Sequence, residues 1–154
     1  MRVTKQFSVS LVNKPGRLAD MLAALGKAKV GFQALSVMDR TERGCVRFVT
    51  EAVEAAKQVL GDLNLRFELT DVLLVDVPPQ VGGFRKICER LAAEHLNIDY
   101  AYSSFESAGK AKGGGLAVIK VNDLSKAQRL LTENGTMRKR RPIRRPVTAT
   151  RQAG

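Results

Sequence analysis

The chain has 154 residues, 44% of them hydrophobic, which is enough to bury the core of one domain or of two small ones. It has no early apolar run that would mark a secretory signal and no run of about 18 apolar residues that would span a membrane, so we expect a cytoplasmic protein without a membrane partner. The net charge of +11 suggests an acidic partner, but residues 135–154 hold seven Arg or Lys and no acid, which leaves +4 on residues 1–134.

Alternation of apolar and polar residues predicts strands, and an apolar period of about 3.6 residues predicts helices between them. The expected strands, in chain order, cover approximately residues 3–12, 30–39, 44–50, 65–70, 71–78, 96–106 and 115–121. One helix is expected directly after Gly16 and another directly after Gly82, and two more begin near Val53 and Leu124.

The order of these elements repeats along the chain. Gly16 and Gly82 each precede a helix, and the apolar positions that follow coincide at an offset of 66, as Leu18 does with Phe84. The later helices of the two halves coincide at an offset of 71. Each half therefore has the order strand, helix, strand, strand, helix, strand, in which two right-handed crossovers place both helices on one face of an antiparallel sheet.

This order is that of the ferredoxin-like fold, and we predict an α+β protein of two such βαββαβ units, with their sheets side by side and the helices on one face. No Gly or Pro linker separates the halves, so they should form one rigid body. The predicted units are residues 1–70 and 71–134, followed by a basic, flexible tail over 135–154. A weak last strand at 136–141 would extend the second unit to about residue 147.

Two surfaces of this predicted sheet are open to partners. The strand at 71–78 keeps an unpaired edge if the last strand pairs weakly, and we expect a homodimer for this reason. The face of the first strand opposite the helices is polar, which suits water or a second layer. Its residues are Thr4, Gln6, Ser8 and Ser10.

The stretch Val12-Asn13-Lys14-Pro15-Gly16-Arg17-Leu18 joins the first strand to the first helix. Together with the doubled order of strands and helices, it resembles tandem ACT domains, small regulatory modules of amino-acid metabolism, over about residues 3–134. The resemblance implies an eight-stranded sheet and a free amino acid bound where the strand-to-helix loop meets a neighbouring unit. It also implies a sensor, or a subunit that regulates a metabolic enzyme.

The physics of this loop favours a ligand independently. The first turn of a helix leaves N–H groups without partners and carries a partial positive charge, which attracts a carboxylate. Pro15 fixes φ and Gly16 has no Cβ, so we expect the N–H groups of Gly16, Arg17 and Leu18 to face the ligand. Asn13 would hold the ammonium or the carboxylate of an amino acid, and Asp39 would balance charge if a neighbouring unit presents it. The candidate residues are Asn13, Lys14, Pro15, Gly16, Arg17, Leu18 and Asp39.

Two alternatives apply to the loops. The first loop could be an ordinary turn in which Asn13 or a neighbour only caps the helix. The second loop, Pro78-Pro79-Gln80-Val81-Gly82-Gly83-Phe84, keeps a glycine at the helix entry but has Pro79 where Asn13 would fall. This departure leaves a second site open, for which Gln80, Gly82 and Gly83 are the candidates.

No catalytic or metal-binding arrangement stands out, so we expect neither an enzyme nor a cofactor. Cys45 and Cys88 are far in sequence from each other and from His95, the single histidine, which predicts buried, reduced thiols and a structural imidazole. The glycines at 113–115 precede a strand and form a hairpin tip rather than a phosphate loop. Tyr100 and Tyr102 share one face of a strand and border a ligand pocket or, more commonly, a core or subunit interface.

Two other functions stay open on the sequence. The same fold builds RNA-recognition domains, but Arg43–Thr50 lacks the aromatic residues that stack bases there, so nucleic acid would bind nonspecifically, through the basic tail. The other is a structural adaptor that binds no small molecule.

Overall fold

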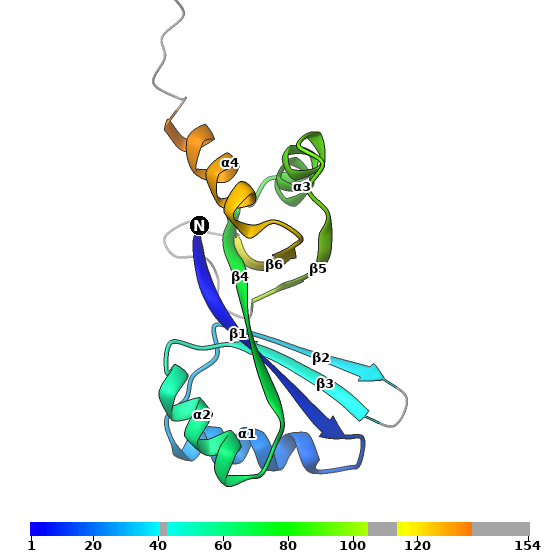
Figure 1. Ribbon diagram of the computed structural model, residues 1–154, viewed down its shortest axis with the longest axis vertical. Helices are drawn as coiled ribbons and strands as arrows, with labels where there is room; N and C mark the ends of the chain where they lie inside the picture. Colours follow the sequence, from blue (N-terminus) through cyan, green and yellow to red (C-terminus); the bar gives the residue numbers. More distant parts are fainter. Residues whose placement is uncertain (41–42, 105–113, 137–154) are drawn as a thin grey trace, which may run out of the picture.

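The computed structural model describes residues 1–40, 43–104 and 114–136, which form two repeats of the expected order (Figure 1). The first elements are β1 (Arg2–Val12), α1 (Arg17–Lys27), β2 (Ala34–Arg40), β3 (Arg43–Val49) and α2 (Val53–Asp62). The remaining elements are β4 (Phe67–Val77), α3 (Gly83–Ala93), β5 (Ile98–Ser103), β6 (Gly115–Val121) and α4 (Leu124–Thr136).

The strands of the described residues form one antiparallel sheet in the order β2-β3-β1-β4-β6-β5. The predicted α+β fold, with two ferredoxin-like sheets side by side, is confirmed. Among the described residues the sheet has six strands rather than the eight implied by the ACT resemblance, because the strands expected separately at 65–70 and 71–78 are the single strand β4 and most of the last expected strand lies outside the described part. The predicted boundary between residues 70 and 71 falls within this strand, and the division into units stays a prediction.

At the centre of the sheet, β1 and β4 each serve both repeats. β1 pairs with β4 from Arg2, opposite Leu74, to Val9, opposite Phe67. From Leu73 onward, β4 also pairs with β6. The start of β4 therefore closes the sheet of the first repeat, and the start of β1 closes the sheet of the second.

This arrangement changes two expectations. Thr136, the first residue of the closing strand expected at 136–141, is the last residue of α4, and residues 137–141 lie outside the described part. The start of β1 pairs with β4 beside the second repeat. The edge of β4 is covered at Val72–Leu74 by Arg2–Thr4 of β1. The open edge on which we based a homodimer is therefore occupied there, and the dimer stays a prediction without that support.

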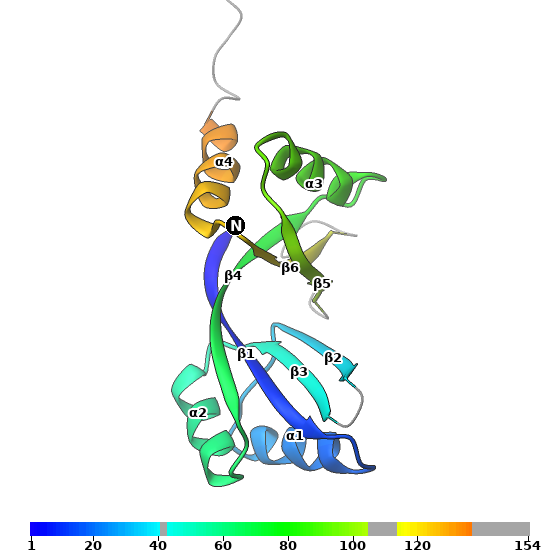
Figure 2. The ribbon, with the colours of Figure 1, turned by 45° about the vertical axis from the view of Figure 1, so that its right-hand side comes forward.

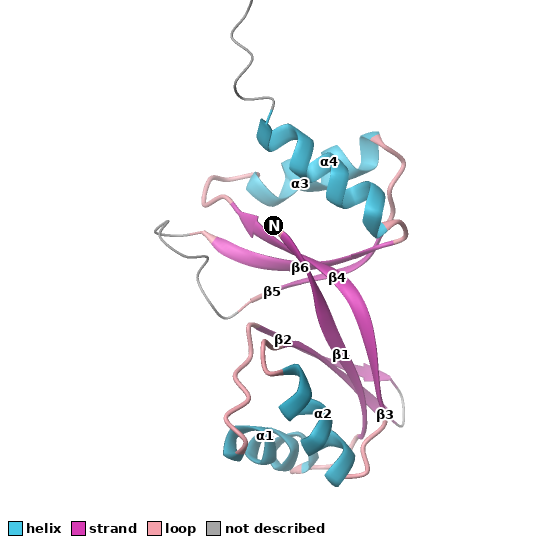
Figure 3. Ribbon diagram, turned by 60° about the vertical axis from the view of Figure 1, so that its left-hand side comes forward, coloured by secondary structure: helices cyan, strands magenta, loops and turns pink. Residues whose placement is uncertain are grey.

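Two apolar cores lie between the sheet and the helices. Val9 of β1 and Leu73 of β4 are fully buried and lie on the same face, because Val3 is opposite Leu73 and side chains alternate with period two. Val9 packs in a core with residues of α1 and α2, whereas Leu73 packs in a core with residues of α3 and α4. All helices therefore cover one face, as predicted, but the twist of the sheet carries the two helix pairs to opposite ends of the molecule (Figures 1 and 3).

A third core joins the two repeats on the opposite face of the sheet. Gln6, one of the polar residues expected to meet water or a second layer, is fully buried there. The second layer is the chain itself, since the sheet curls until its edge strands β2 and β5 lie near each other (Figure 2). The buried apolar residues of this core are Ala34, Val49, Val72, Leu74 and Val118.

The aromatic ring of β3 is unavailable to nucleic acid. Phe48 lies within Arg43–Thr50, where an RNA-recognition domain would present stacking rings, but its side chain is fully buried. It stacks on Phe7 with ring centroids 4.9 Å apart, on the side of the sheet covered by helices. The interpretation that this strand is no base-stacking platform agrees with its position.

The ends of α1, α2 and α3 share one geometry. Lys29, Asn64 and His95 take left-handed conformations, with φ of 58°, 54° and 57°. The residue after each of them donates its N–H to a carbonyl of the last helical turn, which satisfies that carbonyl. After His95, for example, the N–H of Leu96 donates to Leu91 O at 3.0 Å. The single histidine thus sits at a helix end, in the position that Lys29 occupies in the first repeat.

Candidate ligand-binding site

The first strand-to-helix loop forms a tight turn. The N–H of Arg17 donates to Lys14 O at 3.3 Å, and Gly16 has φ 86° and ψ −15°, the geometry of the third residue of a type II turn with Pro15 before it. The expectation that the N–H groups of Gly16, Arg17 and Leu18 all face a ligand is therefore wrong for Arg17, whose N–H is used by the turn. Neither does Asn13 cap the helix, since Gly16 is the N-cap residue and no side chain caps it.

Asn13 and Asp39 come together at the ends of β1 and β2. Nδ2 of Asn13 donates to Oδ1 of Asp39 at 3.4 Å, so Asp39 lies beside the loop of its own repeat. Its presentation to a neighbouring unit stays a prediction. Both side chains are exposed, and so are Lys14, Pro15 and Arg17. This loop is an open surface with a polar pair at one side.

The second loop repeats the turn of the first, despite its different sequence. The N–H of Gly83 donates to Gln80 O at 3.0 Å, and Gly82 has φ 84°. Gly83 lies directly against the chain before it, because a Cβ on Gly83 would be 2.5 Å from Pro78 O. The two adjacent glycines therefore have different roles, since Gly82 allows the left-handed turn and Gly83 allows the close approach.

A cleft of about 400 Å³ opens beside this second loop, between the first turn of α3 and strands β5 and β6. Its walls are mostly apolar, and among the described residues no ionised side chain lines it. Residues that form it include Val77, Pro79, Phe84, Ala101, Ser103 and Ala117. Sequence reasoning placed candidates in the loop but missed the strand residues Ala101, Ser103 and Ala117. Their only sequence signal is that they are smaller than the matching residues of the first repeat.

The start of α3, beside this cleft, has one exposed arginine, Arg85, which pairs with Glu89. Helix α3 has no acidic residue in its first turn, whereas α1 has Asp20. The side chain of Arg85 lies over the turn, since a Cβ on Gly82 would be 3.5 Å from Arg85 Nε, and Arg85 Nη1 donates to Glu89 at 3.1 Å on the surface. The helix N-terminus and this guanidinium together favour an anionic group.

One wall of the cleft reaches the contact between the two repeats. Tyr102 lines the cleft, and its hydroxyl donates to Gln6 Oε1 at 2.8 Å, while Gln6 Nε2 donates to the Tyr100 hydroxyl at 2.6 Å. Burial raises the pKa of Tyr102 above its ordinary value, and the neighbouring Tyr100 raises it further, whereas Arg47 lowers it. Of the two tyrosines predicted to border a pocket or a core, Tyr102 lines the cleft, and the hydroxyls of both bond to Gln6 in the contact between the repeats.

Arg47 completes this buried cluster. Its guanidinium carbon lies 3.9 Å from the centre of the Tyr100 ring, and its Nη1 donates to Met38 Sδ at 2.9 Å. The side chain is 9% exposed, and its Nε is buried without a hydrogen-bond partner among the described residues. The positive charge of Arg47 is thus stabilised chiefly by the face of the Tyr100 ring.

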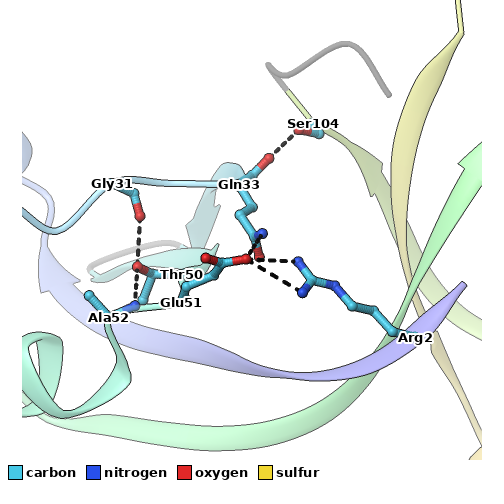
Figure 4. A network of polar contacts seen from close by, with 7 residues as sticks. All are labelled: Arg2, Gly31, Gln33, Thr50, Glu51, Ala52 and Ser104. Carbon is cyan, nitrogen blue, oxygen red and sulfur yellow. Dashed lines mark hydrogen bonds and ion pairs between the residues drawn. The ribbon is translucent and has the colours of Figure 1, made fainter. Parts of the chain in front are cut away.

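A second polar link between the repeats lies at the start of α2 (Figure 4). Nε2 of Gln33 donates to Glu51 at 3.1 Å, Arg2 approaches the same carboxylate at 3.5 Å, and the Ser104 hydroxyl donates to Gln33 O. A cavity of about 320 Å³ lies beside this network. The Thr50 hydroxyl, which lines it, donates to Gly31 O at 2.7 Å and accepts from the N–H of Ala52, the residue before α2, so this hydroxyl serves the fold.

The other sequence candidates carry no site in the described residues. Cys45 and Cys88 are free, but both are half-buried, so the prediction of buried thiols is wrong in that respect. Within residues 1–40, 43–104 and 114–136, no three His, Cys, Asp or Glu side chains are placed to hold a metal ion. Nor does any helix in this part of the chain have the length and apolar character needed to cross a membrane. Residue 113 of the expected glycine hairpin tip and the basic tail from 137 onward lie outside the described residues.

Comparison with known proteins identifies the family. A family model described as an ACT domain pair matches residues 1–137, a range that includes every described residue. The chain belongs to this ACT domain pair family. The resemblance predicted from the loop and the doubled order of elements is thereby confirmed, and the ACT pair is a regulatory module. No curated protein matches the chain.

Solved structures resemble this ACT pair over most of its length. Protein BT0572 from Bacteroides thetaiotaomicron has a TM-score of 0.78 and 28% identity, covering 86% of this chain and 89% of that one. The ligand-free regulatory subunit of aspartate kinase from Thermus thermophilus has a TM-score of 0.55 and 16% identity, covering 86% and 97%. The corresponding subunit from Thermus flavus has a TM-score of 0.54 and 17% identity, covering 88% and 94%. At such low identity, the likeness to the kinase subunits shows the fold alone.

Proposed function

We propose that this ACT pair is a non-catalytic, cytoplasmic sensor that binds a free amino acid at a strand-to-helix loop and regulates a partner, such as a metabolic enzyme. The observation that carries the proposal is the cleft of about 400 Å³ beside the second loop. Its volume falls within the range of roughly 300–1,000 Å³ that small-molecule sites occupy. Gln80, Gly82 and Gly83 form the turn between Pro79 and Phe84, both of which line the cleft.

The electrostatics of the second loop support an amino acid as the ligand. Lys86 donates its N–H to Gly82 O as the first intrahelical bond of α3, so the N–H groups of Phe84 and Arg85 stay available at the helix start. A carboxylate beside them would also meet the Arg85 guanidinium. The first loop, with Asn13 and Asp39, is the second candidate, and there the Gly16 and Leu18 N–H groups are available.

The position of Tyr102 supports a regulatory role. It is one of the residues around the cleft, and its side chain bonds to Gln6 in the first repeat, so a ligand in the cleft would lie next to a residue that holds the repeats together. A ligand shifts the arrangement of the repeats only by its difference in affinity for two arrangements. Contact with Tyr102 provides such a difference, because any movement of β5 relative to β1 changes both the cleft and this hydrogen bond.

The test is the binding of each common amino acid to the full chain, first by thermal shift and then by calorimetry. At a ligand concentration of 100 times Kd, we expect stabilisation of about 2.7 kcal/mol. Arg85→Gln and Arg17→Gln identify the loop, and we expect only Arg85→Gln to weaken binding. If no amino acid stabilises the chain or gives a binding heat, the sensor proposal is wrong, and a structural adaptor becomes the better explanation.

A further inference from the structure

The two repeats differ at the positions that surround the cleft. In the first repeat, Leu35 of β2 lies opposite Phe48, and in the second, Ala101 of β5 lies opposite Ile119 at the matching place. Two residues further along the edge strand, Val37 of the first repeat is matched by Ser103. The second repeat therefore has a smaller side chain at both edge-strand positions that face its first helix.

The next strand continues this difference. Val46 of β3 lies opposite Val37 and is 1% exposed, and the matching residue of β6 is Ala117, which lies opposite Ser103. The sheet below the start of α3 has thus lost side-chain volume at three adjacent positions of two strands. A close-packed interior does not leave such volume empty without a reason, because unfilled space forfeits dispersion contacts.

The helix side of the cleft has the opposite change. Leu18 of α1 and Leu35 both pack against the first core. The residue that matches Leu18 in α3 is Phe84, whose side chain is larger, lines the cleft and is 37% exposed. Small residues on the strands and a large, partly exposed ring on the helix leave room for a ligand between them.

We propose that this cleft binds the side chain of an amino acid with an apolar side chain, and that the first repeat has no equivalent pocket because Leu35, Val37 and Val46 fill it. The inference rests on the proposed function and names the ligand class and the repeat that binds it. Ala101, Ser103 and Ala117 are then the residues that determine specificity.

The distribution of charge supports this class of ligand. Among the described residues, the cleft walls contain no ionised side chain that could pair with a charged ligand side chain. Positive charge lies outside these walls, at the start of α3, where Arg85 approaches the turn at Gly82 and pairs with Glu89. A molecule with a carboxylate at one end and carbon at the other matches this pattern, whereas a second charge would enter the apolar part without a partner.

The experiment refills the cleft with the residues of the first repeat. Ala101→Leu and Ser103→Val replace exposed side chains of an edge strand, so both variants should fold, which circular dichroism and the melting temperature of the free protein check. The matched control is Val37→Ser in β2, which makes the reverse change at an exposed position of the first repeat. Binding of Leu, Ile, Val, Met and Phe is compared by calorimetry with that of Gly, Asp and Lys.

We expect at least one apolar amino acid to bind the natural chain about tenfold or more tightly than Gly, Asp and Lys, since one or two methylenes in a fitted apolar pocket discriminate by this factor. Ala101→Leu and Ser103→Val should each weaken that binding about tenfold or more, whereas Val37→Ser should leave it unchanged. If a charged amino acid binds best, or if refilling has no effect, this inference is overturned while the sensor function stands. If no amino acid binds the natural chain, the proposed function and the inference fall together.

Discussion

The hydroxyl of Tyr102 and the Oε1 of Gln6 are joined by a hydrogen bond of 2.8 Å across 96 residues of chain. Gln6 is fully buried, so its amide is satisfied by the protein: Oε1 accepts from Tyr102, and Nε2 donates to Tyr100. One side chain of the first repeat thus depends on two residues of the second. These hydrogen bonds fix the register of the apolar contact between the repeats, because they form only when Gln6 faces both tyrosine hydroxyls.

Removing one partner of this bond should destabilise the protein. In Tyr102→Phe, Gln6 Oε1 stays buried without its donor, and we expect the free energy of unfolding to fall by about 1–3 kcal/mol. Urea denaturation measures the change, with an unchanged slope if the variant still unfolds in two states. The neighbouring exposed Ser103→Ala is the control and should change the stability by no more than about 0.5 kcal/mol. A Tyr102→Phe variant as stable as the natural chain would show that the bond contributes nothing.

The raised pKa of Tyr102 predicts a loss of stability at alkaline pH. The folded state keeps the phenol protonated above the pH at which the unfolded chain loses this proton, near 10. The unfolded state then binds fewer protons than the folded one, so the stability present below about pH 10 falls as pH rises, by up to about 1.4 kcal/mol per pH unit. Urea denaturation between pH 8 and pH 11, compared for the natural chain and Tyr102→Phe, measures it. Parallel profiles for the two proteins would contradict the assignment to Tyr102.

The order of elements was predictable because it depends on local patterns. Alternating residues such as Phe7 and Val9 mark a strand with one buried face, and the repeated glycines at 16 and 82 mark helix entries. The choice of closing strand was not predictable in this way. Pairing of Val3 with Leu73 depends on which of several apolar edges meets β4, and periodicity contains no information about that choice.

The candidate site was only partly predictable, for a similar reason. The loop at Gly82 was found from its resemblance to the loop at Gly16, but the cleft beside it depends on the volumes of Ala101 and Ser103, which come close to Phe84 only in the folded chain. The engagement of the Arg17 N–H follows from the type II turn, whose hydrogen bond returns to Lys14. Residue types identified the turn, but its bonding pattern decided which amides stay free.

Replacement by alanine should have different effects on stability at Gly83 in the second loop and at Gly61 in α2. Gly83→Ala would place a Cβ 2.5 Å from the backbone Pro78 O, so either the loop or the start of α3 must move. We expect a loss of about 1–3 kcal/mol, typical of overpacking at a rigid contact. Gly61→Ala in α2 is the control, because a Cβ there meets nothing within 4 Å, and the exchange should be neutral or stabilising by up to about 1 kcal/mol. Thermal unfolding monitored by circular dichroism compares the two, and equal effects would rule out the close contact.

The double use of β1 predicts that the second repeat depends on the first residues of the chain. Deletion of Met1–Thr4 removes the strand that pairs with Val72, Leu73 and Leu74, and it removes Val3 from the second core. The amides of Val72–Leu74 should then exchange with solvent about tenfold or more faster, because pairing is lost at three positions, each hydrogen bond is worth about 1 kcal/mol, and a tenfold change corresponds to about 1.4 kcal/mol. Hydrogen exchange read by mass spectrometry or NMR measures this.

The control for the deletion is Arg2→Gln, which keeps the backbone of β1 and removes only an exposed ion pair with Glu51. Its exchange rates should match those of the natural chain. The amides of β3, which pair with the later residues of β1, should also keep their protection in the deletion variant, because Gln6–Val12 are intact. If β3 and β4 lose protection equally, the start of β1 stabilises the whole sheet rather than closing the second repeat.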